Sequence, residues 1–349
     1  MKVVHLLWNL GTGGIETMLV DIVNRQVLLT EIEGVSIIVV NDIVQQSIVS
    51  KIDKRVKVLA CNRKKGSRSL WSIVKLNKCL FSLKPDVIHF HAPGIRNMVF
   101  HPAKKALTIH TTGYKAEVGR RFDVLYAISN AVREEWRNMG TDSVVVQNGI
   151  PCEEIAVKSQ YWNGEGDFHI IQVSRISFYH KGQDLLVKAV AALEEPLKER
   201  VHLTFVGEGE DMSMLQGVVK ECGLGNNVEF LGLKDRTWVY PHLKDYDLFV
   251  QPSLFEGFGL TVAEACAAGL PVLVSENEGP LEIICNGKYG ATFKNKDIQS
   301  LTENLKGILE GGYDELVSKA KEARQHVLET YDVGITAKQY VEEYKKLLK

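Results

Sequence analysis

Residues 251–271 read Gln251-Pro-Ser-Leu-Phe-Glu256-Gly-Phe-Gly-Leu-Thr-Val-Ala-Glu264-Ala-Cys-Ala-Ala-Gly-Leu-Pro271, and this segment decides how the rest of the chain is interpreted. The apolar run 247–250 before it has the length of a buried parallel strand. The run 260–268 favours a helix that Gly269 would end. The glycine turn between them leads into a helix N-terminus, which has free backbone N–H groups and a positive dipole end. The segment therefore predicts an anion-binding site.

Two carboxylates, Glu256 and Glu264, bracket this turn at a spacing of eight positions. Carboxylate oxygens accept hydrogen bonds from paired hydroxyl groups, so the spacing suits an elongated ligand that contains a sugar and a ribose. The alternative is an ordinary acidic turn residue followed by a solvated helix residue. The surrounding sequence favours the ligand.

The pattern Pro-Ser-x-x-Glu256-Gly-Phe-Gly-x-x-x-x-Glu264-Ala resembles the E-x7-E motif of retaining glycosyltransferases, specifically of glycosyltransferase family 4. That family has the GT-B fold, two Rossmann-like doubly wound α/β domains that face each other across a cleft. The resemblance implies that Glu264 binds ribose hydroxyls of a nucleotide-diphosphate sugar and that Glu256 binds the transferred sugar. It implies further donor contacts, including the backbone that holds the diphosphate, at Gly257, Phe258, Gly259, Leu260 and Thr261.

Length and composition indicate a two-domain globular protein. The chain has 349 residues, of which 45% are hydrophobic and 24% charged. No run approaches 18 consecutive apolar residues, and the first apolar run leads into a glycine loop instead of a cleavage site, so we expect neither a membrane span nor export. Six cysteines without Cys-x-x-Cys spacing predict reduced thiols in the cytoplasm and no zinc site or disulfide framework.

Charge is distributed unevenly along the chain. Residues 1–150 carry 21 basic and 12 acidic side chains, whereas residues 151–349 carry 21 basic and 31 acidic ones. The segment 51–84 holds eleven basic residues and one acid, Asp53. This pattern indicates that the first half meets an anionic surface or substrate.

Helical spacing follows the most basic part of that segment. Leu70, Trp71, Ile73, Val74, Leu76, Leu80 and Phe81 recur around Lys75 and Lys78. A basic amphipathic helix with an edge tryptophan can lie in a membrane interface. The alternative, that the apolar face packs on the sheet, stays open.

A second glycine loop follows the apolar run 3–8 and leads into a helix that we expect to begin near Thr17. It lacks the third glycine of the dinucleotide fingerprint, because Glu16 stands there. Asp42, after the run 35–40, sits where a ribose-binding acid would, so a dinucleotide-dependent oxidoreductase remains an alternative. The loop resembles the N-terminal glycine loop of family 4, which implies that Gly13 lies on the acceptor side and Gly14 on the donor side.

Two further apolar runs deliver histidines to the ends of expected strands. Asp86-Val-Ile-His-Phe-His91 and Ala106-Leu-Thr-Ile-His110 both end at such a position, and ligands of parallel sheets bind beyond the carboxyl ends of strands. A lone histidine is more often structural. The family resemblance implies that His91, His110 and Thr111 line the acceptor side, with His110 also near the sugar.

The second half opens with a strand-like run, 168–173, followed by Arg175 and Lys181 before a helix from Asp184. A planar guanidinium and a point-charge ammonium together can neutralise a diphosphate leaving group. The resemblance supports this diphosphate clamp and adds Gly207, after the run 201–206, as a donor contact. Asp245-Tyr-Asp247 matches an Asp-x-Asp metal motif only superficially, because family 4 has a structural acid there.

Taken with the resemblance, these patterns predict a cytoplasmic retaining glycosyltransferase whose domains span 1–150 on the acceptor side and 151–330 on the donor side, with a terminal helix, 331–349, that crosses back. We expect no metal or other cofactor, no nucleic acid, and an acceptor hydroxyl that is lipid-linked, as in bacterial surface glycan synthesis at the inner face of a membrane. A non-catalytic sugar-nucleotide-binding subunit is a further alternative. The predicted catalytic residues are Glu256, His110, Arg175 and Lys181.

Overall fold

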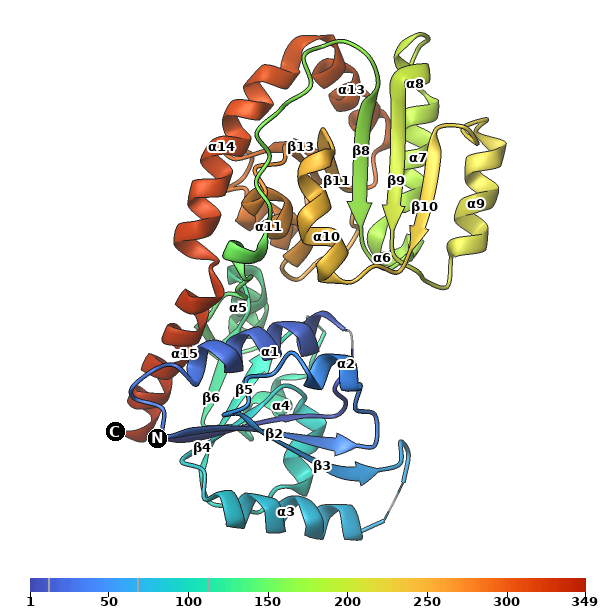
Figure 1. Ribbon diagram of the computed structural model, residues 1–349. Helices are drawn as coiled ribbons and strands as arrows, with labels where there is room; N and C mark the ends of the chain where they lie inside the picture. The colour runs from blue at the N-terminus through green and yellow to red at the C-terminus, as the bar shows by residue number, and fades with distance from the viewer. Residues whose placement is uncertain (12, 68, 112) are drawn as a thin grey trace. The chain divides into compact units, whose positions relative to one another are not determined.

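The structure is a computed structural model that describes residues 1–11, 13–67, 69–111 and 113–349, without the side chain of Glu278. It divides into two compact α/β units (Figure 1), Met1–Pro151 with Tyr331–Lys349, and Cys152–Thr330. Arg68, part of the predicted basic segment, lies outside the described residues. Among the helices in the described ranges, none combines the length and apolar character that a membrane crossing requires.

The first unit is built on a parallel sheet with the strand order β3-β2-β1-β4-β5-β6-β7. The chain moves from β1 to β3 in one direction and then restarts on the other side of β1, so the sheet is doubly wound as predicted. Its strands are β1 Lys2–Leu7, β2 Gly34–Asn41, β3 Lys57–Arg63, β4 Val87–Phe90, β5 Lys104–Ile109, β6 Val124–Ala127 and β7 Val144–Val145.

Helices cover both faces of this sheet. Helices α1 and α15 lie on one face and α3 on the other (Figure 1). Tyr340, Val341 and Tyr344 of α15 are buried against α1 and the strands, which is the apolar face expected for the terminal segment. The helices are α1 Gly14–Gln26, α2 Gln46–Val49, α3 Trp71–Leu83, η1 Pro93–Met98, α4 Ala116–Gly119, α5 Asn130–Asn138 and α15 Val333–Leu348.

Helix α1 begins at Gly14, three residues before the predicted start near Thr17. Gly13 is its N-cap, in extended conformation, and the Thr17 hydroxyl donates back to the carbonyl of Gly13 at 3.1 Å. Helical geometry therefore starts at Gly14. The periodicity of apolar side chains does not indicate this start, because glycine has no side chain. The glycine loop is therefore shorter than predicted.

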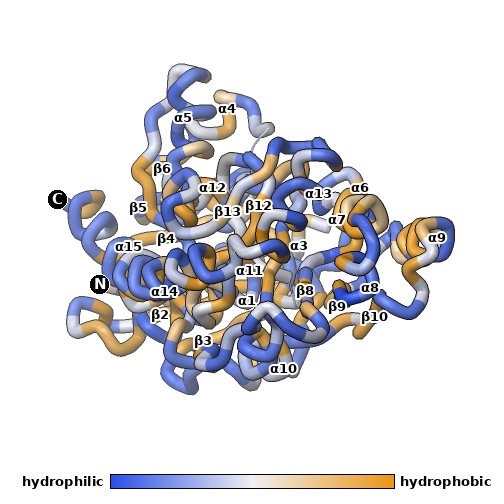
Figure 2. The backbone as a smooth tube through the Cα atoms, turned by 90° about the horizontal axis from the view of Figure 1, so that it is seen from above, coloured by the Kyte–Doolittle hydropathy of each residue, from blue (hydrophilic) through white to orange (hydrophobic). Residues whose placement is uncertain are grey.

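The second unit is also a doubly wound parallel sheet, with the order β10-β9-β8-β11-β12-β13. In Figure 2 hydrophobic stretches recur along the tube in both units, and the central strands β8, β9, β11 and β12 are buried along most of their length, as strands covered on both faces should be. The two sheets confirm the predicted fold class. The strands are β8 Phe168–Val173, β9 Val201–Val206, β10 Val228–Gly232, β11 Leu248–Gln251, β12 Val272–Ser275 and β13 Ala291–Phe293.

The core of this unit includes apolar side chains of α7, α9, α13 and α14 packed on the strands, among them Leu186, Leu215, Leu301 and Leu316. Its helices are η2 Cys152–Glu154, α6 Phe178–Lys181, α7 Gln183–Ala191, α8 Leu197–Arg200, α9 Met212–Glu221, α10 Arg236–His242, η3 Leu243–Asp245, α11 Leu260–Ala267, α12 Glu278–Ile283, α13 Ile298–Gly307, η4 Ile308–Gly312 and α14 Tyr313–Thr330.

Candidate functional site

The topological switch point of the second sheet lies between β8 and β11, which are neighbours although two strands separate them in sequence. Ligands of open parallel sheets bind at the carboxyl ends of the strands at such a point. The loop 174–182 follows β8 and the turn 252–259 follows β11. The two sequence motifs predicted to bind the donor therefore meet at one edge of one sheet.

Glycines allow the loops at this edge to pack against one another. Gly182 has φ 61°, and a Cβ there would lie 2.2 Å from the carbonyl oxygen of Pro252. Gly207 has φ 139°, and a Cβ there would lie 2.0 Å from the carbonyl oxygen of Ser174. Both positions exclude every other residue type by conformation and by space. Gly207 thus supports the loop that carries Arg175.

Lys181 and Glu256 form an ion pair in which Nζ donates to Oε2, although they are 75 positions apart in sequence. Both side chains are largely buried, and Gln251 Nε2 lies 3.4 Å from the same carboxylate oxygen. The structure thus brings together one cation and one anion that the sequence assigned to the donor site. Sequence reasoning missed Gln251, since it closes a buried strand and looks like a core residue.

Arg175 lies on the same loop as Lys181 but pairs with a different acid. Its Nε and Nη2 lie 2.9 and 2.7 Å from Oε2 of Glu210, and its side chain is exposed. A cavity of about 690 Å³ opens beside it. The lining combines Arg175 with residues that follow β9 or belong to α9 and β10, which the sequence analysis did not single out: Glu208, Gly209, Met212, Gln216, Phe230 and Gly232.

Helix α11 begins at the turn as predicted. Gly259 is its N-cap at φ 99°, and its first turn, which contains Leu260 and Thr261, carries no acidic side chain. The positive end of the helix dipole is therefore not compensated by the helix's own residues. Phe258 is buried, and Gly279 of α12 packs so closely that a Cβ there would lie 2.6 Å from the Phe258 backbone nitrogen. The Gly279 N–H also donates to the carbonyl of Glu256 at 3.3 Å, next to Gly257.

Glu264 lies on α11 and is only 6% exposed. Tyr240 of α10 donates its hydroxyl to Oε1 at 3.0 Å, and Arg236 Nε lies 3.9 Å from the same oxygen. These contacts compensate the negative charge of the Glu264 carboxylate inside the unit. Its role in binding ribose hydroxyls stays a prediction.

Asp245 and Asp247 do not share a site. Asp245 is exposed, whereas Asp247 is buried with Oδ1 3.5 Å from Nζ of Lys158 and Oδ2 accepting the backbone N–H of His169 at 3.0 Å. Burial lowers the pKa of Lys158, an effect that Asp247 partly offsets. The described contacts make Asp247 a structural acid that neutralises a buried lysine.

The first unit places its predicted site residues at the ends of β1, β4 and β5. Gly13 precedes α1 and Gly14 opens it, and the Glu16 carboxylate folds back over Gly13. His91 is buried and follows β4, and its Nδ1 lies 3.1 Å from Nε2 of His110, which follows β5. Burial lowers the pKa of His110 to about 4, so its imidazole is neutral near pH 7. Thr111 is exposed beside it.

The basic helix α3 has two apolar faces. The spacing of its apolar residues suggested only one, and that prediction was wrong. Leu76 and Leu80 are fully buried against the sheet, as the alternative interpretation expected. The other face is exposed, with Trp71 at 73%. The remaining exposed apolar side chains of α3 and of the residue before it are Leu70, Val74 and Phe81.

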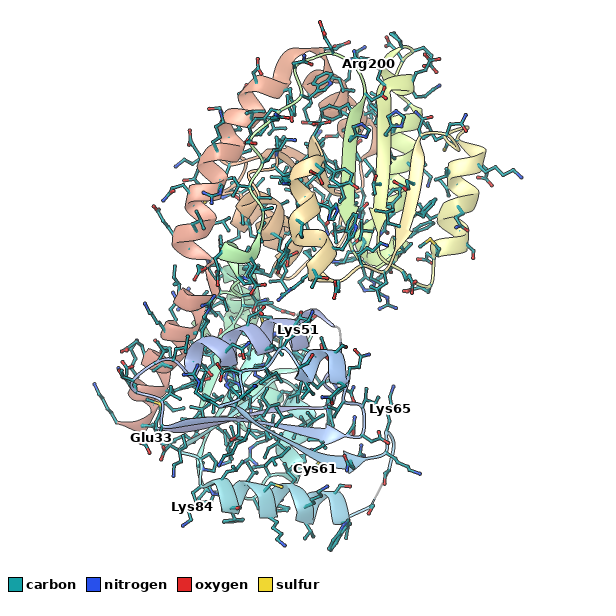
Figure 3. All side chains as sticks on the ribbon, in the orientation of Figure 1. Glu33, Lys51, Cys61, Lys65, Lys84 and Arg200 are labelled. Atoms are coloured by element: carbon teal, nitrogen blue, oxygen red, sulfur yellow. The ribbon has the colours of Figure 1, made fainter. Side chains whose placement is uncertain are left out.

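Exposed lysines belong to the same basic segment as that exposed face. Lys64, Lys65 and Lys78 are exposed, and Figure 3 shows Lys65 beyond β3 and Lys84 at the end of α3, both at the periphery of the unit. Arg63 differs, because it lies over the ring of Trp8 and donates to Ser67 and Asn41. Arg63 therefore holds the fold locally and is not a free surface charge.

Comparison with known families accounts for both units. The sequence matches the family described as Glycosyltransferase Family 4 over residues 12–154 and the family described as Glycosyl transferases group 1 over residues 156–327. The chain belongs to the family 4 type of GT-B glycosyltransferases. The family predicted from residues 251–271 is thus confirmed.

Relatives of this glycosyltransferase chain differ widely in substrate. It is 28% identical over 287 residues to the glycogen synthase of Mycobacterium tuberculosis, covering 72% of this chain and 66% of that protein. It is 32% identical over 180 residues to an N,N'-diacetylbacillosaminyl-diphospho-undecaprenol alpha-1,3-N-acetylgalactosaminyltransferase of Campylobacter jejuni, covering 52% and 45%. The matches therefore span less than two thirds of the length of these relatives.

Solved structures agree in fold along almost the whole chain. Anabaena Alr3699/HepE in complex with UDP and glucose superposes with a TM-score of 0.81 at 18% identity, covering 99% of this chain and all of that one. The apo form of the lipopolysaccharide outer core galactosyltransferase WaaB superposes with a TM-score of 0.77 at 19% identity, with the same coverage. These likenesses support the GT-B fold.

Proposed function

We propose that this glycosyltransferase moves a sugar from a nucleotide-diphosphate sugar to an acceptor hydroxyl with retention of the anomeric configuration, as a hexosyltransferase. The observation that carries the proposal is the meeting of Lys181, Glu256 and the N-terminus of α11 at the switch point of the second sheet. Cationic and dipolar groups there suit a diphosphate, and the carboxylate suits a sugar hydroxyl. Two structural neighbours, Alr3699/HepE with UDP and with UDP-glucose, support this kind of donor.

In this mechanism the bond between the sugar anomeric carbon and the diphosphate oxygen breaks while the acceptor oxygen bonds to that carbon from the same face. The acceptor proton passes to the departing phosphate, so no side chain acts as a covalent nucleophile. Lys181, Arg175 and the N–H groups of residues 259–261 stabilise the negative charge that grows on the leaving group. Because these groups supply the positive charge, the proposal includes no metal.

A screen of nucleoside-diphosphate sugars by thermal unfolding tests the donor assignment. We expect at least one of them to raise the unfolding midpoint, since a ligand that binds only the folded state stabilises it by mass action. Sugar transfer from the same compound should proceed equally well in EDTA. Stabilisation by a nicotinamide dinucleotide instead would favour the oxidoreductase, and donor binding without turnover on any acceptor would favour a non-catalytic subunit. Activity that EDTA abolishes and Mn²⁺ restores would contradict the metal-free clamp.

For the acceptor we propose a lipid-linked saccharide, used at the inner face of a membrane during synthesis of a bacterial surface glycan. The exposed apolar face of α3, with Trp71 at its start, belongs to the basic segment 51–84, in which Lys64, Lys65 and Lys78 are exposed, while the second half of the chain is acidic. Apolar side chains can enter the lipid interface while the lysines contact anionic headgroups. Each such cation contributes on the order of 1 kcal/mol, so a few give reversible binding.

Vesicle sedimentation measures this association. We expect the protein to bind vesicles that contain anionic lipid and to be released by added salt, because screening weakens the lysine contribution. The triple variant Lys64→Gln, Lys65→Gln, Lys78→Gln should lose most of the binding. Arg63 is left intact because of its contacts with Trp8 and Ser67.

A matched variant removes the same charge elsewhere. Lys220→Gln, Lys294→Gln, Lys338→Gln changes three exposed lysines away from α3 and should bind vesicles like the wild type. Equal sedimentation with neutral vesicles, or equal losses in the two triple variants, would show that the face of α3 is not an anionic-lipid contact.

A further inference from the structure

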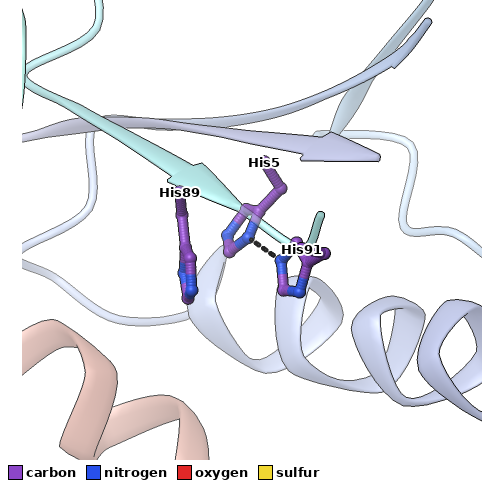
Figure 4. A group of neighbouring side chains, drawn as sticks. All are labelled: His5, His89 and His91. Atoms are coloured by element: carbon purple, nitrogen blue, oxygen red, sulfur yellow. Dashed lines mark hydrogen bonds between the residues drawn. The ribbon is translucent and has the colours of Figure 1, made fainter. Parts of the chain in front are cut away.

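Three buried side chains of the first unit form a continuous hydrogen-bonded series behind His110. His110 Nε2 lies 3.1 Å from His91 Nδ1, His91 Nε2 lies 3.0 Å from His5 Nδ1, and His5 Nε2 lies 2.9 Å from Gln26 Oε1. Figure 4 shows the contact between His5 and His91, with His89 beside them. The series runs from the residue after β5, through the residue after β4 and a residue of β1, to the last residue of α1.

The glutamine oxygen at one end gives this series a direction. An amide oxygen only accepts, so His5 must carry its proton on Nε2. A neutral imidazole has one donor and one acceptor, so His5 Nδ1 accepts from His91 Nε2, and His91 Nδ1 accepts from His110 Nε2. Burial keeps all three rings neutral, because it lowers the pKa of His5 and His110 to about 4 and that of His91 well below its ordinary value.

We propose that Gln26, His5 and His91 are positioning residues that hold His110 as the Nε2–H tautomer, leaving Nδ1 to accept a hydrogen bond from a hydroxyl of the sugar or of the acceptor. The proposal rests on the proposed function. Because His110 is then neutral and accepting, it contributes no positive charge to the diphosphate. That task stays with Arg175 and Lys181.

A metal site is the competing interpretation of the same cluster, since ring nitrogens of His5, His89 and His91 lie within 4.8 Å of one another. All six ring nitrogens already have a partner, those of His89 being Tyr344 and Thr108. The rings also stack, with centroids 4.6 to 5.3 Å apart and planes inclined by 25° to 37°, so their lone pairs do not converge. A metal ion would have to replace these hydrogen bonds.

The second competitor is the reverse direction. Gln26 Nε2 has no hydrogen-bond partner among the described residues, and rotating the amide would place it against His5 instead. Every donor in the series would then reverse, and His110 would carry its proton on Nδ1. The two directions differ in the protonated nitrogen of each ring, which NMR observes directly.

Long-range ¹H–¹⁵N correlation spectra of the full chain with ¹⁵N-labelled histidine test the direction without any turnover. We expect His5, His91 and His110 all to be neutral Nε2–H tautomers near pH 7. Of the other titratable groups, His89 packs against His5 and His91, and Tyr126, Tyr340 and Tyr344 pack on His89. Nδ1–H tautomers, or Zn²⁺ that raises the unfolding midpoint and shifts the signals of His5, His89 and His91 together, would overturn the proposal.

Variants at Gln26 test the consequence for catalysis. Gln26→Leu removes the fixed acceptor, so His110 should show mixed tautomers and kcat should fall roughly tenfold with the donor KM unchanged. Thr108→Val removes a neighbouring buried hydrogen bond to His89 and controls for loss of stability, since it should leave the His110 tautomer and kcat unchanged.

The two measurements, the histidine tautomers and kcat, test the positioning role and the proposed function separately. Absence of sugar transfer in the wild type would refute the proposed function while the spectra still decide the direction of the series. A wild-type kcat in Gln26→Leu with altered His110 tautomers, or an equal fall in Thr108→Val, would refute the positioning role while the proposed function stands.

Discussion

Lys181→Ala is expected to lower kcat for sugar transfer by about 100-fold while the dissociation constant of the donor changes by only a few-fold. Negative charge on the leaving phosphate grows toward the transition state, so an ammonium beside it stabilises the transition state more than the bound donor. In the structure Lys181 donates to Glu256 at the start of the turn that leads into α11, so the ammonium is already held at the proposed phosphate site. Measurement requires steady-state kinetics together with donor titration by thermal unfolding.

Lys188→Ala is the matched control for this experiment. Lys188 lies on α7, directly after the Lys181 loop, and pairs with Asp184 at the helix surface. A surface pair of this kind contributes little, so this variant should keep the wild-type kcat. If both variants keep kcat and donor affinity near wild type, Lys181 is an ordinary ion-pair partner of Glu256 and the clamp is wrong.

The second large effect is on stability. Asp247→Asn should destabilise the second unit by about 3 kcal/mol, because it leaves the buried Lys158 ammonium without its counter-ion. For a unit of this size that corresponds to a fall in unfolding midpoint of roughly 6–12 °C. The amide oxygen can still accept from the His169 N–H, so the loss is mainly that of charge. Differential scanning calorimetry measures it.

Two further variants identify the cause. Asp245→Asn changes the exposed acid of the same Asp-x-Asp sequence and should alter stability by less than about 0.5 kcal/mol. Adding Lys158→Met to Asp247→Asn should recover much of the loss, because an apolar side chain needs no counter-ion. Wild-type stability of Asp247→Asn combined with lost activity that Mn²⁺ restores would instead make Asp247 a metal ligand.

Local sequence predicted the elements of the site because the interactions that form them are local. Short apolar runs predicted strands such as 248–251 and 201–206, and the glycines at 257, 259 and 269 indicated a turn and a helix end. Each of these properties depends on residues within one or two helical turns. The exact start of α1 at Gly14 was missed for the same reason, since glycine contributes nothing to apolar periodicity.

Side-chain partners were decided only by the tertiary structure. Lys181 meets Glu256 because β8 and β11 are neighbours, and Arg175 meets Glu210 because the loop after β9 folds back beside it. Sequence order does not state which strands pair. The Lys158–Asp247 pair and the exposed outer face of α3 depend equally on what packs nearby.

The histidines show most clearly what cannot be predicted from local sequence. The sequence alone placed His91 and His110 at the ends of two strands, where a ligand could reach them. It could not identify His5 or Gln26 as their partners, because an alternating polar residue in a buried strand and a glutamine at the end of an amphipathic helix have no pattern of their own. Strand adjacency, β1 beside β4 and β4 beside β5, aligned these rings into one series. The sequence by itself therefore determined the family, the two sheets and the turn before α11, whereas folding decided which side chains pair within each unit, since this pairing depends on contacts between residues far apart in the chain.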